Sequence, residues 1–337
     1  MNKTLKILLV VALIAGVSYY FINRKPWTTL KSELKDFSVQ DTASVYKVFI
    51  ADKRGGKVTL NKTENKVWLV NNNIEADANK INLLLSTLKD VQVLRPVAQN
   101  EFNSTIAFMS TEGIKVELYD KNNDIIKTIY VGTATPEQTG TFMMIEGSST
   151  PFVCHIPGFV GYLTPRFFSH ALAWHSKLVF KQTENDITKV ALSYPQNPAD
   201  GFSIENGETP VLKDAKGQIL PVDKGFAKYY LSGFANLFFE GYKEGLPPGF
   251  KDSVRHSTPY CVITLNDKNN TETKLYTYYK KVDSQTKQQE DEQGNPLIID
   301  REKYWGFLNN DTNLFVMQKY NFGRLFKTLG EFNTSSK

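Results

Sequence analysis

The stretch that decides the fold occurs twice in the chain. The first copy is Val116-Glu117-Leu118-Tyr119-Asp120-Lys121-Asn122-Asn123, and at an offset of 147 residues (116 to 263) the second copy is Ile263-Thr264-Leu265-Asn266-Asp267-Lys268-Asn269-Asn270. Alternate positions are apolar in both copies, which is the period of a half-buried strand. Asp-Lys-Asn-Asn has the residue types of a tight turn, so each copy predicts a β-hairpin.

The similarity continues on both sides of this hairpin. The corresponding segments are 45–50 and 187–192, 58–60 and 202–204, 67–70 and 211–213, and 152–153 and 315–316. Each set of strands leads into a segment with helical periodicity, 77–88 in the first copy and 223–239 in the second, with Asp77 and Asp223 as the expected N-caps. The residues added in the second copy, 280–294, are polar and typical of a long solvated hairpin.

These patterns predict an α+β fold made of two tandem strand-rich repeats behind one N-terminal transmembrane helix. Each repeat is expected to run β-β-β-α-β-β-β-β with mostly antiparallel pairing. The predicted divisions are an anchor at 1–26, a first repeat at 27–168, a linker at 169–185, a second repeat at 186–330 and a disordered tail at 331–337.

The N-terminus has the pattern of a membrane anchor. An uncharged apolar run, residues 7–22, follows Lys3 and Lys6 and precedes Arg24, Lys25 and Trp27. With residues 5–22 in the membrane, the helix would span roughly 27 Å, slightly less than a bilayer core of about 30 Å. A signal peptide cut after Ser18 is the alternative, and the apolar residues that follow it favour a retained anchor.

Basic residues flank both ends of this segment, so charge alone leaves its orientation open. A short N-terminal tail usually stays in the cytoplasm while a large domain is exported. We therefore expect a single-pass protein of the cytoplasmic (inner) membrane with its body on the periplasmic side, a cytoplasmic body being the alternative.

Composition argues against several classes of protein. The net charge is +5, and the 40 Lys and Arg residues are scattered among 35 Asp and Glu residues. Nucleic-acid binding is therefore not expected. Cys154 and Cys261 stand in apolar runs without a zinc-binding spacing, and we interpret both as small buried residues, with a disulfide as the alternative.

The chain resembles a bacterial envelope family known as domain of unknown function 4340. The resemblance rests on the anchor, on the strand-like segments 56–60 and 66–70, and on the helix at 77–88. It also rests on Tyr162-Leu163-Thr164-Pro165, which precedes a second half that begins near Trp174. It implies an exported or membrane-anchored protein. Many members are encoded beside subunits of an ABC-type transport system of the kind associated with gliding, which implies an accessory role in an envelope transport complex. The family supplies no catalytic residues.

The sequence lacks the common catalytic motifs, including the nucleophile elbow, the P-loop and the HExxH zinc motif. His170 and His175 are five residues apart, which is neither a same-face helical spacing nor a metal-binding pattern. We predict no catalytic residue, cofactor or metal, and no enzymatic activity. A hydrolase that depends on His170 or His175 is the least favoured alternative.

Aromatic residues gather in the second half and suggest a partner surface. The residues assigned to it are Trp174, Tyr229, Phe238, Phe239 and Tyr242, and a bulkier core in the second repeat is the alternative explanation. The predicted function is a non-catalytic accessory or scaffold protein that binds other envelope membrane proteins, among them ABC transporter subunits. The alternative is a module that binds a glycan, lipid or peptide in a cleft between the repeats, near Trp174.

Overall fold

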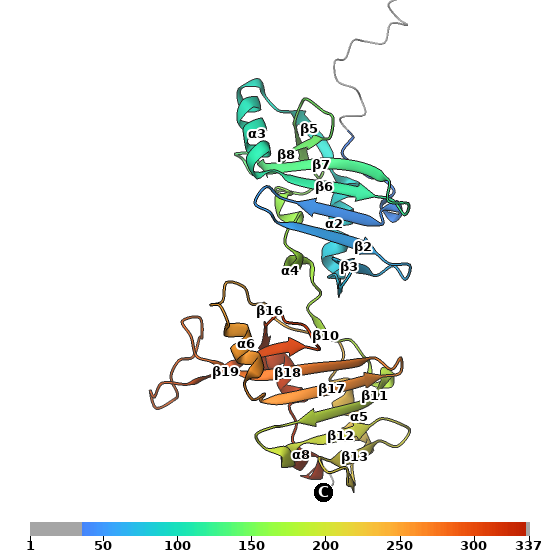
Figure 1. Ribbon diagram of the computed structural model, residues 1–337, viewed down its shortest axis with the longest axis vertical. Helices are drawn as coiled ribbons and strands as arrows, with labels where there is room; N and C mark the ends of the chain where they lie inside the picture. The colour runs from blue at the N-terminus through green and yellow to red at the C-terminus, as the bar shows by residue number, and fades with distance from the viewer. Residues whose placement is uncertain (1–35, 335–337) are drawn as a thin grey trace, which may run out of the picture. The chain divides into compact units, whose positions relative to one another are not determined.

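The computed structural model of the protein describes residues 36–334. Its chain divides between His175 and Ser176 into two units, each with its own strands and helices (Figure 1). The predicted anchor at residues 5–22 lies outside the described residues. Within 36–334, no helix is both long enough and apolar enough to cross a membrane.

Among the described residues, the first unit is built on a nine-stranded antiparallel sheet whose strand order is β4-β3-β2-β1-β6-β7-β8-β9-β5. Its elements are β1 (Lys47–Ala51), β2 (Lys57–Lys62), β3 (Trp68–Val70), β4 (Ile74–Glu75), α2 (Ala78–Asp90), β5 (Gln92–Pro96), α3 (Gln99–Glu112), β6 (Ile114–Tyr119), β7 (Ile125–Ala134), β8 (Thr141–Ile145), β9 (Phe152–His155) and the short α4 (Ala171–Trp174).

Within the described part of the second unit, the main sheet is also nine-stranded and antiparallel, in the order β14-β13-β12-β11-β17-β18-β19-β20-β16. Its elements are β11 (Ile187–Ser193), β12 (Phe202–Glu205), β13 (Val211–Asp214), β14 (Ile219–Leu220), α5 (Lys224–Ser232), β16 (Gly241–Tyr242), α6 (Phe250–His256), β17 (Cys261–Asp267), β18 (Glu272–Lys281), β19 (Ile299–Leu308), β20 (Phe315–Gln318), α7 (Lys319–Phe322) and α8 (Leu329–Thr334). β10 (Leu178–Phe180) and β15 (Leu237–Phe238) form a separate two-stranded sheet.

The two large sheets therefore have the same strand order, and equivalent strands also pair in the same register. Val48 and Ile50 of β1 face Leu118 and Val116 of β6. In the second unit, Val190 and Leu192 of β11 face Leu265 and Ile263 of β17. All of these apolar side chains are buried in the core of their unit. The predicted strand-rich α+β fold with antiparallel sheets is confirmed.

The first helix of each unit begins where the sequence predicts. The Asp77 carboxylate accepts hydrogen bonds from the backbone N–H groups of Asn79 and Lys80, and Asp223 accepts one from Phe226. Ile81, Leu84 and Leu88 of α2 recur at helical spacing and are buried in the main core of the first unit. Both caps are confirmed.

The hairpin turns at Asp120 and Asp267 are also confirmed. Each carboxylate accepts hydrogen bonds from the backbone N–H groups two and four residues further on. Asn123 and Asn270 have positive φ values of 67° and 57°, a conformation that Asn tolerates better than most residues. The same turn chemistry therefore closes the β6–β7 and β17–β18 hairpins.

The predicted element order of each repeat was incomplete. The nine-stranded sheet of each unit has a fourth strand before the capped helix α2 or α5, and after that helix come a further strand of the sheet and a second helix: β5 and α3 in the first unit, β16 and α6 in the second. The helix predicted at 223–239 ends at Ser232, because Gly233 caps it and Asn236, with a φ of 54°, leaves the helical conformation.

The described structure also differs from the predictions for the linker and the tail. Part of the segment predicted as a linker is packed, because Trp174 is buried in the first unit and β10 pairs with β15 in the second. Residues 331–334 of the predicted disordered tail belong to α8, where the Phe332 ring is buried against Phe202 and Tyr230. Burial of the Phe332 ring thus holds these residues in a helix, although the sequence around them is mostly polar.

Candidate functional site

The five aromatic residues of the predicted partner surface do not form one patch. Tyr229 on α5 and Phe238 on β15 are exposed, with 77% and 49% of their surface accessible. The Phe239 ring is buried and stacks on Phe315 with ring centroids 4.2 Å apart. Tyr242 is half-buried with its ring edge against Phe239, and burial raises the pKa of its hydroxyl. Two of the five thus face solvent, while Phe239 and Tyr242 pack against the core.

Trp174 is an internal residue of the first unit. Its side chain is fully buried, its indole N–H donates to the carbonyl oxygen of Phe168 at 2.9 Å, and its ring meets the Phe168 ring edge to face. The sequence-based assignment of Trp174 to a surface is therefore wrong: the ring belongs to the core, where a large apolar side chain with a satisfied N–H is most stable.

His170 and His175 lie in different environments. His175 is buried and pairs through its backbone with Ala76, whereas His170 is exposed at the start of α4. Over residues 36–334, no group of three or more His, Cys, Asp and Glu side chains is arranged to hold a metal ion.

Near His170, Ser169 and Asp52 form a direct hydrogen bond. The Ser169 hydroxyl donates to Oδ2 of Asp52 at 2.5 Å, while Oδ1 accepts from the N–H groups of Arg54 and Gly56. The Ser169 hydrogen bond is the main cause that lowers the pKa of Asp52. In a catalytic triad the serine hydroxyl would donate to a histidine, whereas here Ser169 donates to the carboxylate. The hydrogen bond therefore connects the end of the first unit to the β1–β2 turn.

The most distinctive feature of the second unit is the segment between β18 and β19, residues 282–298, which we call the arm. It projects away from the sheet in the ribbon view (Figure 1). The β7–β8 connection at the equivalent place in the first unit is short, residues 135–140. The sequence predicts this arm, since 280–294 are polar, but it gives no indication of how the arm is held.

Buried charges hold the base of the arm. The Lys280 ammonium group lies 2.8 Å from the Asp283 carboxylate and 3.3 Å from that of Asp300, and the Thr286 hydroxyl bonds Asp300 at 3.1 Å. The hydrogen bond from Lys280 is the main cause that lowers the pKa of Asp283. This network joins the last residues of β18 to the first residues of β19 and gives a polar segment a defined path.

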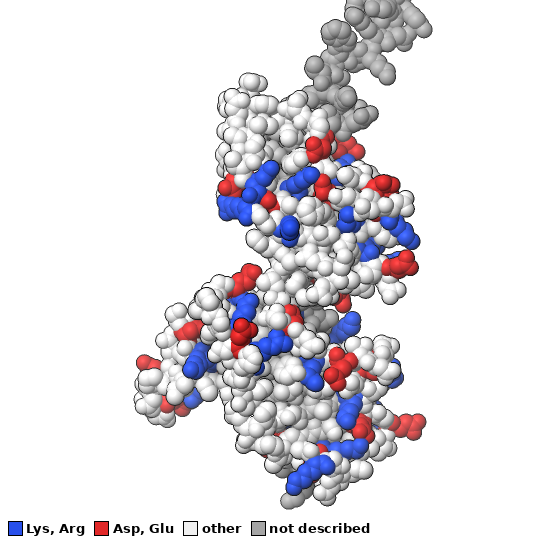
Figure 2. Space-filling model, viewed as in Figure 1, with Lys and Arg blue, Asp and Glu red and all other residues white. Residues whose placement is uncertain are grey.

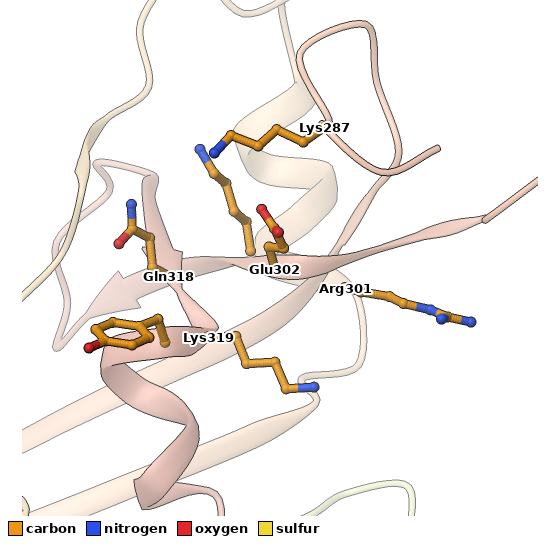
Figure 3. Close-up of a pocket in the computed structure, with 7 residues that line it drawn as sticks. Lys287, Arg301, Glu302, Gln318 and Lys319 are labelled. Carbon is orange, nitrogen blue, oxygen red and sulfur yellow. The ribbon is translucent and has the colours of Figure 1, made fainter. Parts of the chain in front are cut away.

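A basic pocket of about 490 Å³ lies beside the arm (Figure 3). It is lined by Lys287 of the arm, by Arg301, Glu302 and Lys303 of β19, and by Gln318, Lys319 and Tyr320 where β20 passes into α7. In the close-up, Lys287 projects from the arm on the same side as Glu302, whereas Arg301 extends away. The four cations come from three separate segments, so no local sequence motif could have revealed the pocket.

One wall of this pocket is fixed by Glu240. Lys303 lies 2.9 Å from the Glu240 carboxylate, and the Gln318 side-chain amide donates to it at 3.2 Å. Partial burial acts to raise the pKa of Glu240, but these two bonds outweigh it and the pKa is lowered.

Lys287 and Lys319 are exposed and, among the described residues, neither has a carboxylate within ion-pairing distance. Arg301 is likewise exposed and, within residues 36–334, in no ion pair. Three lining cations without an ion pair therefore stand against one lining carboxylate, that of Glu302, and this excess of positive charge suits an acidic group.

Elsewhere the visible surface carries mixed charge. Lys and Arg are interspersed with Asp and Glu over the face of each unit shown in Figure 2. In that view neither unit presents a broad face of one sign, such as a protein that follows a nucleic-acid backbone needs.

The fold and site describe a strand-rich α+β protein of two antiparallel sheet units, with a basic pocket and an arm on the second unit. The family model described as "Domain of unknown function (DUF4340)" matches residues 68–252, more than half of the chain, from β3 to α6. The chain belongs to this family, as the sequence resemblance predicts. Neither a curated protein nor a solved structure matches the chain.

Proposed function

We propose that this chain is a non-catalytic accessory or scaffold protein of the bacterial envelope. Its N-terminal segment anchors it in the cytoplasmic membrane, its body lies on the periplasmic side, and it binds other membrane proteins, among which ABC transporter subunits are the first to test. The anchor is supported by the apolar run at 7–22 with basic flanks, and the transporter connection by the family resemblance.

We further take the two units to be diverged copies of one ancestral unit. The shared strand order, the equivalent β1–β6 and β11–β17 registers, and the Asp120 and Asp267 turns support this interpretation. Duplication favours a scaffold, because a second copy of a structural unit adds surface without any requirement for new chemistry.

The observation that carries the proposal is the arm with its basic pocket. The main core of the second unit is formed by its sheet, α5 and the C-terminal helices, and the arm contributes no residue to it. A polar segment held by a buried ion-pair network, next to lysines without acidic partners, is suited to an acidic protein surface. Exposed Tyr229 and Phe238 provide further contact area on the same unit.

The alternative, a glycan, lipid or peptide module near Trp174, loses its proposed contact residue because that ring is buried in the first unit. A ligand-binding role therefore needs a different site.

Affinity purification tests the scaffold proposal. The tagged full-length chain is recovered from membranes in mild detergent after cross-linking, and co-purifying envelope proteins are quantified. We expect Lys287→Glu/Lys319→Glu to lose those partners, and Lys216→Glu/Lys268→Glu, which changes two other exposed lysines, to keep them. Because exposed charges are screened by salt, the wild-type yield should fall as salt rises. A chain recovered alone and monomeric, or a pocket variant that keeps every partner, counts against the proposal.

The location of the body is tested separately by adding trypsin to intact spheroplasts. The proposal expects cleavage after exposed lysines of the body, such as Lys216. Protection of residues 27–337 until the membrane is lysed would place the body in the cytoplasm.

A further inference from the structure

A second concavity of the second unit lies between α6 and the strands β18 and β19. It has a volume of about 530 Å³, which is within the range of roughly 300–1,000 Å³ typical of small-molecule pockets. Its apolar and aromatic lining consists of Leu246 and Phe250 before and at the start of α6, Val254 within it, Tyr279 of β18, Val282 just after β18, and Trp305 of β19. We call this concavity the α6 groove.

Two lysines stand at the polar rim of the α6 groove. The Lys243 ammonium group donates to the side-chain oxygen of Gln285 at 3.0 Å, and Lys281 is exposed. Among the described residues, neither lysine has a carboxylate within ion-pairing distance. The carboxylate of Asp283 is also on the rim, but it is bound by the buried Lys280. The rim therefore has an excess of positive charge next to an apolar wall.

The first unit contains the equivalent groove without these features. It lies between α3 and the strands β7 and β8, has a volume of about 230 Å³, and is lined by Ser104, Thr105, Phe108, Met109, Thr133 and Phe142, none of which is charged. Phe142 and Trp305 correspond, because Phe142 pairs with Val153 on β9 and Trp305 with Val316 on β20. The groove in the second unit is thus larger at the same place in the fold, and two lysines line it where the groove of the first unit has no charged residue.

We propose that the α6 groove binds an amphiphilic anion, with its apolar body against Trp305 and Phe250 and its carboxylate or phosphate between Lys243 and Lys281. An uncharged apolar ligand would leave both ammonium groups without an acidic partner, and a cationic one would be repelled by them. This inference goes beyond the proposed scaffold function and does not depend on it.

The test uses the full-length chain in nanodiscs of zwitterionic lipid and measures tryptophan fluorescence while 8-bromooctanoate is added. Bromine quenches an indole that it contacts, so a ligand in the groove should quench Trp305 in a saturable manner. We expect Trp305→Phe to remove the saturable quenching and Trp68→Phe, a buried tryptophan of the first unit, to retain it.

Charge selection is the decisive part of the test. Lys243→Gln/Lys281→Gln should bind 8-bromooctanoate about tenfold more weakly, since a hydrogen bond between charged groups is lost. Lys216→Gln/Lys268→Gln should bind it like the wild type. The uncharged 8-bromooctanol should bind the wild type about as weakly as the charged probe binds the double variant. Displacement by octanoate or by octyl phosphate then shows which head group is preferred.

A second variant keeps the proposal testable if the Trp305→Phe chain fails to fold. Ser253 is exposed on α6 and lines the groove, so Ser253→Glu adds an opposing charge without disturbing the core. It should weaken binding of 8-bromooctanoate and leave that of 8-bromooctanol unchanged. Absence of saturable quenching in the wild type, or equal affinity for the acid and the alcohol, would overturn the proposal.

Discussion

The ammonium nitrogen of Lys280 lies 3.3 Å from Oδ2 of Asp300, and both side chains are buried beneath the base of the arm. Lys280 also lies 5.6 Å from the centre of the Trp305 ring, which lines the α6 groove. The Oδ1 atom of Asp300 accepts hydrogen bonds from the backbone N–H groups of Glu302 and Lys303, at the edge of the basic pocket. One buried ion pair thus supports both concavities of the second unit.

Removal of one partner of this pair should destabilise the second unit strongly. Asp300→Ala removes the buried partner of Lys280, which then keeps the partly exposed Asp283 at 2.8 Å, so we expect a loss of roughly 1.5–3 kcal/mol in the free energy of unfolding. Urea denaturation measures it. The matched control is Glu272→Ala, which removes an exposed pair with Lys274 and should cost at most about 1 kcal/mol. Equal losses in the two variants would contradict a structural role for the buried pair.

The N-caps of the two main helices should contribute similar amounts to stability. Asp77→Ala removes the acceptor for the N–H groups of Asn79 and Lys80, and a cap of this kind contributes about 0.5–2 kcal/mol. Asp223→Ala should have an effect of the same size on the second unit. Asp90, in the last turn of α2, is the control, because a negative charge there opposes the helix dipole. Asp90→Ala should therefore leave stability unchanged or increase it, as urea denaturation will show.

The hydrogen bond between Ser169 and Asp52 should make the stability of the first unit depend on pH. The pKa of Asp52 is lowered in the folded state, so the unfolded chain binds more protons in the acidic range. The stabilisation is fully present above the unfolded pKa of about 3.9 and is lost as pH falls through the folded pKa.

Ser169→Ala should therefore reduce stability by roughly 1.5–3 kcal/mol at pH 7, where the bond to a charged carboxylate is intact, and by less at pH 3. Thermal unfolding at both pH values measures the difference. Ser86→Ala, on the exposed face of α2, should show the same small effect at either pH. A Ser169→Ala loss that does not change with pH would show that the hydroxyl acts without the Asp52 charge.

Those parts of the fold that depend on local chemistry could be predicted from the sequence. The Asp120 and Asp267 turns and the Asp77 and Asp223 caps were identified because each depends on a few neighbouring residues. The helix α3 was missed, because its buried residues are limited to Thr105 and Met109 and it shows little apolar periodicity. The strands β5 and β16 were missed because they become strands through pairing with distant β9 and β20.

The site was predicted less well, for a physical reason. Aromatic residues occur both in cores and in binding surfaces, so Phe239 and Trp174 could not be distinguished from Phe238 and Tyr229 by residue type. The basic pocket and the α6 groove are each assembled from segments that are adjacent only after the sheet has formed. The polar run at 280–294 correctly indicated a solvated segment, but Lys280 and Thr286 within it are buried.

The two cysteines offer separate reporters for the two units. Cys154 lies on β9 in the first unit and Cys261 on β17 in the second, and both are free and fully buried. Burial raises the pKa of Cys154 well above its ordinary value and that of Cys261 to about 12, so neither thiol forms much reactive thiolate at pH 8. In native buffer both should react with a thiol reagent much more slowly than a free cysteine does.

Single-cysteine variants then allow each unit to be observed during unfolding. In Cys261→Ala the remaining Cys154 should become reactive at the urea concentration that unfolds the first unit, and in Cys154→Ala the remaining Cys261 should report on the second. Asp300→Ala should lower the midpoint for Cys261 and leave that for Cys154 unchanged, because each unit has its own core. A single midpoint that moves for both cysteines would mean that the two units unfold as one.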